Sequence, residues 1–214
     1  MKQISLAFFF SAALIFTGCK NENNKDTELE NDQMNAMEND SLAEADQENR
    51  TITVQIESKS GSEMTGEAVF TQENGEVTMT ATLSGLPEGM HAIHLHEKAD
   101  CSAEDASSAG GHWNPTMEDH GKWGDEAGYH RGDIGNFDVD AEGNGSVTFT
   151  TDQWCIGCDD EKRNIVGKAV VVHDGVDDYT SQPSGAAGNR IGCGVIEGEG
   201  DQTENSMDET ENQQ

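Results

Sequence analysis

The sequence predicts an all-β domain, a sandwich or barrel of about eight short strands. Three observations lead to this prediction. Apolar and polar residues alternate with a period of two over several segments, which is typical of strands with one buried face. The turns between these segments are rich in glycine, and no convincing amphipathic helix lies between them.

The strands can be placed in order along the chain. The first, 51–57, puts Ile52, Val54 and Ile56 on one face, and the segment 76–83 repeats this pattern. Between 66–71 and 76–83, the dipeptide Asn74-Gly75 indicates a tight hairpin turn. Five further strands are predicted at 93–97, 137–140, 146–150, 166–173 and 194–197.

Two long polar segments, 98–132 and 174–190, interrupt this regular spacing. Loops of that length inside a compact domain usually carry function. We therefore expect the functional residues to lie mainly in these two segments.

The composition limits both the domain organisation and the class of partner. The chain has 214 residues, with 42 acidic against 12 basic side chains and a formal net charge of −30. So few basic groups exclude a nucleic-acid binder that works by neutralising phosphates. The polar, acidic segments 19–50 and 198–214 flank a middle that is richer in apolar residues. We predict one domain at 51–197, between a disordered tether and a disordered tail.

The amino terminus has the features of an export signal. Lys2 precedes a mostly apolar run that ends at Thr17-Gly18-Cys19. This run is too short for a permanent membrane span and fits a signal peptide at 1–18. Gly18 before Cys19 resembles a bacterial lipobox, which implies cleavage before Cys19 and a lipid on its sulfur; the alternative is a plain signal peptide with an incidental cysteine. The resemblance predicts an exported protein anchored in the bacterial cell envelope, facing the periplasm or the cell surface, that touches the membrane only through Cys19.

Four cysteines remain once Cys19 carries the lipid, an even number in an oxidising setting: Cys101, Cys155, Cys158 and Cys193. Four cysteines allow three pairings, and their spacing does not choose among them. The C-x-x-C of Cys155 and Cys158 is compatible with a redox pair or half of a zinc site, but no second C-x-x-C completes a zinc cluster. We expect a local structural disulfide there.

Six histidines and one aspartate are candidate metal ligands: His94, His96, His112, His120, His130, Asp133 and His173. His94 and His96 are two residues apart in a predicted strand, so both imidazoles project to one face. Any one of these histidines alone is more often an ordinary surface residue. Together they favour a metal site, in which an all-imidazole group suits copper and a group of histidines with one aspartate suits tetrahedral zinc.

The runs that contain these residues closely resemble the Cu,Zn superoxide dismutase family. The matching runs are HAIHLHE at 91–97, SAGGHWNP at 108–115, HG at 120–121, HRGDIGN at 130–136, VVHD at 171–174 and GNRIGCGVI at 188–196. They occur in the family's order and cover essentially all of 51–197. The resemblance implies a Greek-key β-barrel with a metal-binding loop and an active-site loop.

The resemblance also assigns the cofactors, copper and zinc. Copper would be held by His94, His96, His112 and His173, and zinc by His112, His120, His130 and Asp133. His112 would then be an imidazolate shared by both ions, which its two ring nitrogens permit. The implied reaction converts superoxide to O₂ and hydrogen peroxide as copper alternates between Cu(II) and Cu(I).

Further residues take their roles from the same resemblance. Arg190 matches the family's active-site arginine, which guides the superoxide anion, and His112 would carry a proton during turnover. Asp177 matches the carboxylate that links a copper histidine to a zinc histidine. His91 corresponds to a histidine that is not a ligand, and we expect a structural role for it.

The resemblance pairs Cys101 with Cys193 and leaves Cys155 and Cys158 as an extra pair that the common family pattern lacks. The spacing from His120 to His130 is about a residue longer than usual in the family. Two alternatives to an enzyme are a copper-buffering domain on the same fold and an adhesin-like sandwich with structural metals. The complete ligand set and the arginine favour the enzyme, and association into a homodimer stays open.

Overall fold

The computed structural model describes residues 49–198. The predicted signal peptide 1–18, the lipidation residue Cys19, almost all of the tether 19–50 and all but the first residue of the tail 198–214 lie outside this range. No helix within 49–198 is long and apolar enough to cross a membrane.

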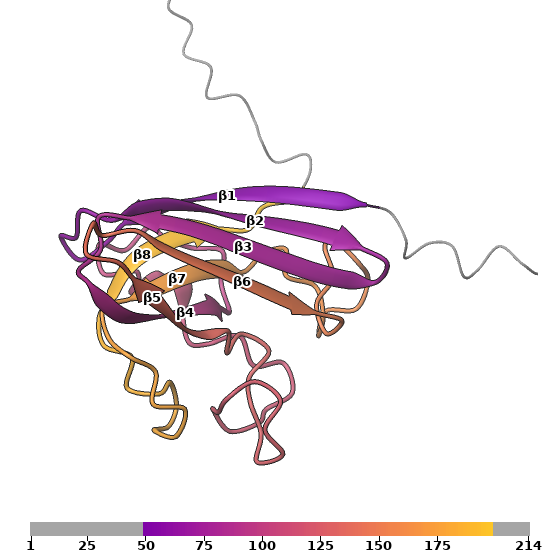
Figure 1. Ribbon diagram of the computed structural model, residues 1–214. Helices are drawn as coiled ribbons and strands as arrows, with labels where there is room; N and C mark the ends of the chain where they lie inside the picture. Colours follow the sequence, from indigo (N-terminus) through magenta and orange to yellow (C-terminus); the bar gives the residue numbers. More distant parts are fainter. Residues whose placement is uncertain (1–48, 199–214) are drawn as a thin grey trace, which may run out of the picture. The chain divides into compact units, whose positions relative to one another are not determined.

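The described residues form eight antiparallel strands in a closed barrel, with the order β1-β2-β3-β6-β5-β4-β7-β8 (Figure 1). β3 pairs with β6 instead of with β4, so the chain crosses over the barrel in the Greek-key manner. The predicted fold class is confirmed. The strands are β1 Arg50–Ser58, β2 Thr65–Glu73, β3 Glu76–Ser84, β4 Gly89–His96, β5 Gly135–Val139, β6 Gly145–Thr151, β7 Ala169–His173 and β8 Arg190–Val195.

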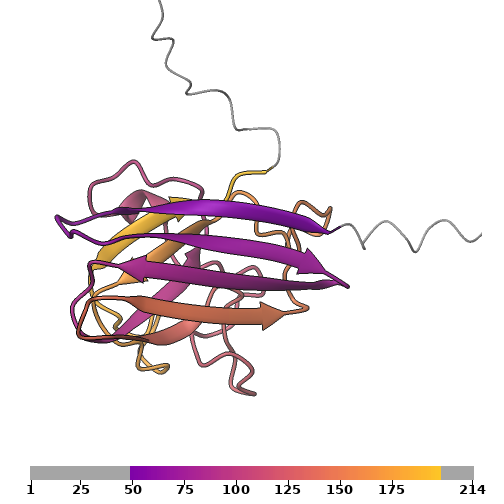
Figure 2. The same ribbon diagram turned by 45° about the horizontal axis from the view of Figure 1, so that its top comes forward.

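The period-two pattern reports burial correctly in the long strands. Ile52, Val54 and Ile56 of β1 face the barrel interior, and the residues between them are exposed. The long strands β1, β2, β3 and β6 lie side by side across one face of the barrel (Figure 2). At the turn between β2 and β3, Asn74 and Gly75 both have positive φ, at 52° and 82°, as a tight hairpin requires.

The largest differences from the predicted strand boundaries are in β4, β7 and β8. β4 begins four residues earlier than expected, β7 begins three residues later, and β8 runs from Arg190 to Val195 instead of 194–197. Gly192 and Gly194 explain the error in β8, because glycine weakens a strand prediction. Here the glycines are needed: a Cβ at Gly192 would meet the sulfur of Met64, and one at Gly194 would meet the backbone of Gln55.

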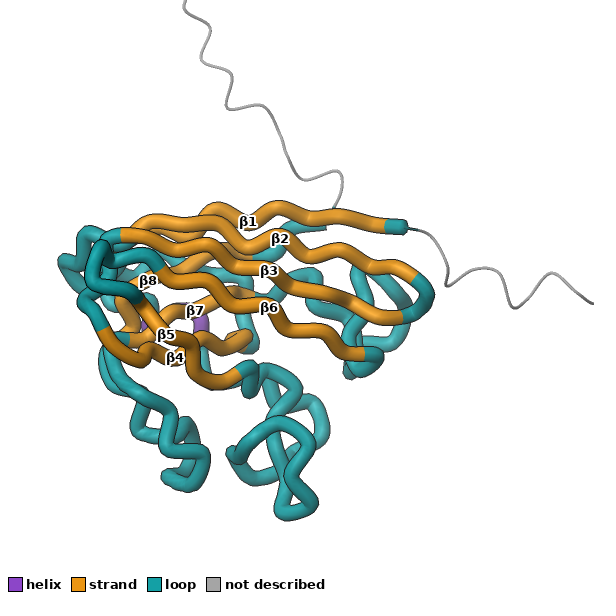
Figure 3. Tube along the Cα trace, viewed as in Figure 1, coloured by secondary structure: helices purple, strands orange, loops and turns teal. Residues whose placement is uncertain are grey.

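The two predicted long loops extend from the same side of the barrel (Figure 3). The first, 97–134, contains a single turn of 3₁₀ helix, η1 at Ser107–Ala109, and the second spans 174–189. A third long loop, 152–168, connects β6 to β7; the prediction left 151–165 between two strands but did not single it out as a long loop. The residues outside the barrel that form or support the candidate site lie in these three loops.

Both disulfides are present. Cys101 pairs with Cys193, with Cα atoms 5.8 Å apart, and ties the first long loop to β8. Cys155 pairs with Cys158 inside the loop 152–168, which confirms the local bridge.

Candidate metal centre

The first group of candidate ligands consists of His94, His96, His112 and His173, which are all buried and offer ligand atoms within 4.8 Å of one another. β4 supplies two of them from one face, while Ile93 and Leu95 on its other face fill the barrel core. His173 ends β7, which pairs with β4. His112 belongs to the first long loop and is held against β4 by a bridge to His96.

The second group consists of His112, His120, His130 and Asp133, which are also buried and equally close together. The Asp133 carboxylate lies 2.8 Å from His112 Nδ1, 3.0 Å from His120 Nδ1 and 3.2 Å from His130 Nδ1. Three Nδ1 atoms and one carboxylate therefore converge on one point, a donor set suited to tetrahedral zinc.

Unpaired ring nitrogens show that the first group fits a metal. His94 Nδ1, His96 Nε2 and His112 Nε2 are buried without a hydrogen-bond partner, although a buried polar atom is costly to leave unpaired. The other ring nitrogen is occupied in each case: His94 Nε2 donates to Asp177 at 2.9 Å, and His96 Nδ1 donates to the Gly110 carbonyl at 3.0 Å. Fixing one nitrogen as the donor leaves the lone pair of the other for a metal.

His112 belongs to both groups, and it offers a different nitrogen to each. Its Nδ1 faces Asp133, and its unpaired Nε2 belongs with the nitrogens of His94, His96 and His173. A single imidazole is therefore placed between the two groups.

Burial favours the neutral form that ligation requires at His96, His112 and His173. Burial lowers the pKa of His112 to about 4, against an opposing hydrogen bond to Asp133. Burial, followed by the neighbouring histidines, also lowers the pKa values of His96 and His173 well below their ordinary value. For His120, burial again favours the neutral form, but hydrogen bonds to Asp133 and Asp177 outweigh it and raise the pKa to about 9.

Asp177 lies behind both groups and joins them. Its Oδ2 accepts from His94 Nε2 and its Oδ1 from His120 Nε2, both at 2.9 Å. Asn136 at the start of β5 holds Asp177 in turn, donating from Nδ2 to its carbonyl at 2.9 Å and accepting from its N–H at 2.8 Å. Asn136 lies within one of the runs that carry the resemblance, yet the sequence analysis assigned it no role of its own.

Gln182 is a second residue that the sequence analysis missed. Its Oε1 accepts from the His120 N–H and its Nε2 donates to the His120 carbonyl, each at 2.9 Å. One side-chain amide from the second long loop thus holds both backbone groups of a ligand in the first. The two residues are 62 positions apart, and no pattern in the sequence indicates the contact.

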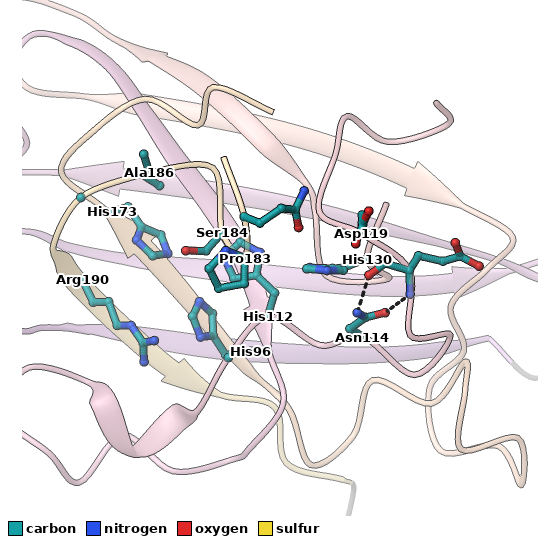
Figure 4. A pocket seen from close by; sticks show the side chains of 15 residues that line it. His96, His112, Asn114, Asp119, His130, His173, Pro183, Ser184, Ala186 and Arg190 are labelled. Atoms are coloured by element: carbon teal, nitrogen blue, oxygen red, sulfur yellow. Dashed lines mark hydrogen bonds between the residues drawn. The ribbon is translucent and has the colours of Figure 1, made fainter. Parts of the chain in front are cut away.

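A pocket of about 700 Å³ opens onto the first group between the two long loops (Figure 4). His96, His112 and His173 line it together with Arg190, whose Nη1 donates to the Ala106 carbonyl at 2.7 Å. Burial lowers the pKa of the Arg190 guanidinium from its ordinary value. Glu118 and Asp119 also line the pocket, so its wall carries charges of both signs.

His91 lies outside both groups. Its Nδ1 is 3.0 Å from the His173 carbonyl and its Nε2 is 2.9 Å from the Pro87 carbonyl. The ring thus contacts the backbone of a ligand without offering a nitrogen to the metal groups.

A Greek-key barrel that carries two adjoining ligand groups with one common histidine defines a binuclear metalloprotein. The family model described as copper/zinc superoxide dismutase (SODC) matches residues 64–196. The chain belongs to the copper/zinc superoxide dismutase family, and its cofactors are copper and zinc.

Individual relatives agree with this membership. Superoxide dismutase (Cu-Zn) 1 of Aquifex aeolicus (strain VF5) is 38% identical over 139 residues, which cover 63% of this chain and 80% of that protein. A double mutant of a SOD-like protein from Bacillus subtilis is similar in structure, with a TM-score of 0.61, 32% identity, and coverage of 68% of this chain and 97% of that one. The clock protein EA4 gives a TM-score of 0.60 at 33% identity, covering 68% of this chain and 92% of that one.

Proposed function

We propose that this chain converts superoxide to O₂ and hydrogen peroxide, with copper at the His94, His96, His112 and His173 group and zinc at the His112, His120, His130 and Asp133 group. Bound copper would supply one-electron redox chemistry by alternating between Cu(II) and Cu(I), and zinc would supply a fixed positive charge. The observation that carries the proposal is the shared His112 beneath a pocket that also contains Arg190.

Arg190 binds and orients the substrate. Superoxide is a small anion, and Arg190 is the one arginine or lysine among the residues that line the pocket in the described part of the chain. Its hydrogen bond to the Ala106 carbonyl fixes the guanidinium beside His96 and His173, so the anion meets a preset charge. A copper-storage site has no use for such a group, and this favours the enzyme over a copper buffer.

His112 moves a proton at its Nε2 atom. Its Nδ1 is directed at Asp133, whereas Nε2 is buried on the pocket side and has no hydrogen-bond partner. Because zinc and Asp133 would hold the ring from the Nδ1 side, Nε2 can take up a proton and return it without the ring turning. One of the two protons that peroxide formation consumes is then delivered inside the pocket by His112, and the other comes from water.

The proposal extends to the location and the assembly of the protein. The lipobox-like Gly18-Cys19 and the acidic tether support an exported protein, anchored in the bacterial cell envelope by lipid on Cys19 and protecting that envelope from superoxide. We expect Cys19→Ser to move the protein from the membrane fraction to the soluble fraction. Association into a homodimer is part of the same proposal. Sedimentation, or measurement of the molecular mass in solution at several protein concentrations, tests it.

The test of function uses the full chain loaded with copper and zinc, beside Arg190→Ala and His112→Ala. We expect fast dismutation by the wild type, a slowed Arg190→Ala and a nearly inactive His112→Ala. A wild type no faster than free copper would refute the proposal and leave copper buffering as the function to test, by metal affinity.

A further inference from the structure

The loop 152–168 meets the segment that carries the zinc-group ligands. Trp154 is fully buried, and its ring lies 6.0 Å from Trp123 and 5.0 Å from Phe149. Trp123 in turn lies 4.8 Å from Tyr129 and 4.8 Å from Phe149. We call Trp123, Tyr129, Phe149 and Trp154 the aromatic brace; it joins the region between His120 and His130 to β6 and the loop that follows β6.

Two polar contacts attach the brace to the backbone and side chains beside the ligands. Trp154 Nε1–H donates to the Arg131 carbonyl at 2.8 Å, between the ligands His130 and Asp133. The Gln153 amide and the Tyr129 hydroxyl are hydrogen-bonded, with Gln153 Nε2 donating at 2.9 Å. Tyr129 directly precedes His130, so both contacts act within one residue of a ligand.

Trp154 is itself anchored to the barrel. The next residue, Cys155, accepts from Ile165 N–H at 3.0 Å and donates to the Arg163 carbonyl at 2.8 Å. Ile156 N–H donates to the Gln72 side chain on β2 at 2.6 Å. The Cys155–Cys158 disulfide closes the loop directly after Trp154. The indole is therefore fixed from the strand side and from the loop side.

The brace is a further external anchor for the ligand segment, beside the Gln182 contacts with His120 and the bond from Leu95 N–H of β4 to the Gly132 carbonyl at 2.9 Å. Three of the four ligands, His120, His130 and Asp133, come from one stretch of the first long loop that contains no strand. Contacts inside this stretch, such as His130 N–H to Asp133 Oδ2 at 2.8 Å, fix the ligands relative to one another only. The brace adds contacts to the rigid barrel, and a loop that is held in place loses less entropy when it binds a metal.

We propose that Trp154 is a positioning residue for zinc: its indole N–H and its aromatic contacts hold the 120–133 segment in the zinc-binding arrangement, and the extra Cys155–Cys158 disulfide keeps Trp154 in place. This inference rests on the zinc assignment proposed above. It also gives a role to the Cys155–Cys158 disulfide, which the common family pattern lacks, and to Tyr129 between His120 and His130.

The test replaces Trp154 by phenylalanine, which keeps an aromatic ring and removes the N–H donor. The full chain loaded with copper and zinc is mixed with a chromophoric chelator, and the rate of zinc release is followed. We expect release about two- to tenfold faster than in the wild type, since the variant loses one neutral hydrogen bond, to the Arg131 backbone, and such a bond contributes about that factor. With Co(II) in place of zinc, the visible spectrum should change because the ligand geometry changes.

Three further variants complete the test. Val54→Ala removes buried volume from β1, far from the zinc segment in sequence, and should lower the melting temperature with zinc release and the Co(II) spectrum unchanged. Tyr129→Phe, at a half-buried residue, and the double variant Cys155→Ser/Cys158→Ser should each speed zinc release; they replace Trp154→Phe if that variant does not fold.

Two results would overturn the inference: folded brace variants that release zinc at the wild-type rate with an unchanged Co(II) spectrum, or a Val54→Ala variant that releases zinc as fast as they do. Failure of the proposed function looks different, because a wild type that binds zinc without dismuting superoxide would leave the release rates intact.

Discussion

Replacing Asp177 by asparagine should weaken copper binding more than zinc binding. The reason is that the two carboxylate oxygens accept different numbers of hydrogen bonds. Oδ1 accepts from the Tyr179 N–H at 2.7 Å and from His120 Nε2 at 2.9 Å, whereas Oδ2 accepts only from His94 Nε2 at 2.9 Å. Asparagine has one acceptor oxygen, and that oxygen keeps more hydrogen bonds in the Oδ1 position. Its amide group then faces His94 Nε2, which must carry a proton for Nδ1 to face copper.

The magnitude follows from the lost contact. A hydrogen bond to a charged group contributes about 1.5–3 kcal/mol, and losing it at His94 corresponds to roughly 10- to 150-fold weaker copper binding. The opposite amide orientation would lose two acceptor contacts instead of one, which costs about 1 kcal/mol more and disfavours it. Loss of the negative charge weakens both metals and does not alter the expected order.

Competition against chromophoric chelators, run separately for Cu(II) and Zn(II) on the full chain, measures both affinities. Asp177→Ala is the matched control: it removes both acceptors and should weaken both metals to a similar extent. An asparagine variant that loses more zinc affinity than copper affinity would refute the reasoning from the Tyr179 contact.

Three further predictions follow from the site. Gln182→Ala should speed zinc release severalfold with little change in melting temperature, because the residue is exposed and its amide holds only the His120 backbone; an unchanged release rate would contradict this. Neutralising the pocket wall with Glu118→Gln and Asp119→Asn should raise kcat/KM for superoxide at low salt, with the gain shrinking as salt screens the field, and a gain independent of salt would argue against an electrostatic cause. In the metal-free protein, the pKa of His120 is raised to about 9 from an unfolded value of about 6.5. The stabilising contribution of His120 is therefore complete below about pH 6.5 and is lost as the pH rises through about 9. The melting temperature should fall over that pH range, and His120→Gln should make the fall smaller.

The strands of the barrel were predictable because the alternation of apolar and polar residues depends only on the local geometry of the backbone. Whether Ile52 or Val54 faces the core depends on the period of the backbone, and the structure buries both. The hairpin at Asn74-Gly75 was predictable for the same reason, since positive φ is a property of those two residues. The candidate ligands stood out by residue type, but their division into two groups and the pairing of Cys101 with Cys193 came from family resemblance.

The start of β8 was not predictable from local pattern. Its glycines lower strand propensity, and the reason they are there is the close approach of Met64 and of the β1 backbone near Gln55. Such an approach exists only once the barrel has closed. The ordered structure of the loop 152–168 was not predictable for a related reason, because it depends on contacts with β2 and on the loop's own disulfide and not on a repeating pattern.

The same distinction separates the ligands of the centre from the residues that hold them. A ligand must be histidine or aspartate, so its side chain restricts the sequence at that position. Gln182 and Trp154 act on backbone carbonyl and N–H groups, which every residue type except proline offers in full, so the contacted positions carry no mark of the contact. Motifs therefore identify the atoms that bind metal, whereas contacts between loops distant in sequence decide how firmly those atoms are held. A chain that kept all seven ligands and lost Gln182 and Trp154 would still match the family and would bind zinc less tightly.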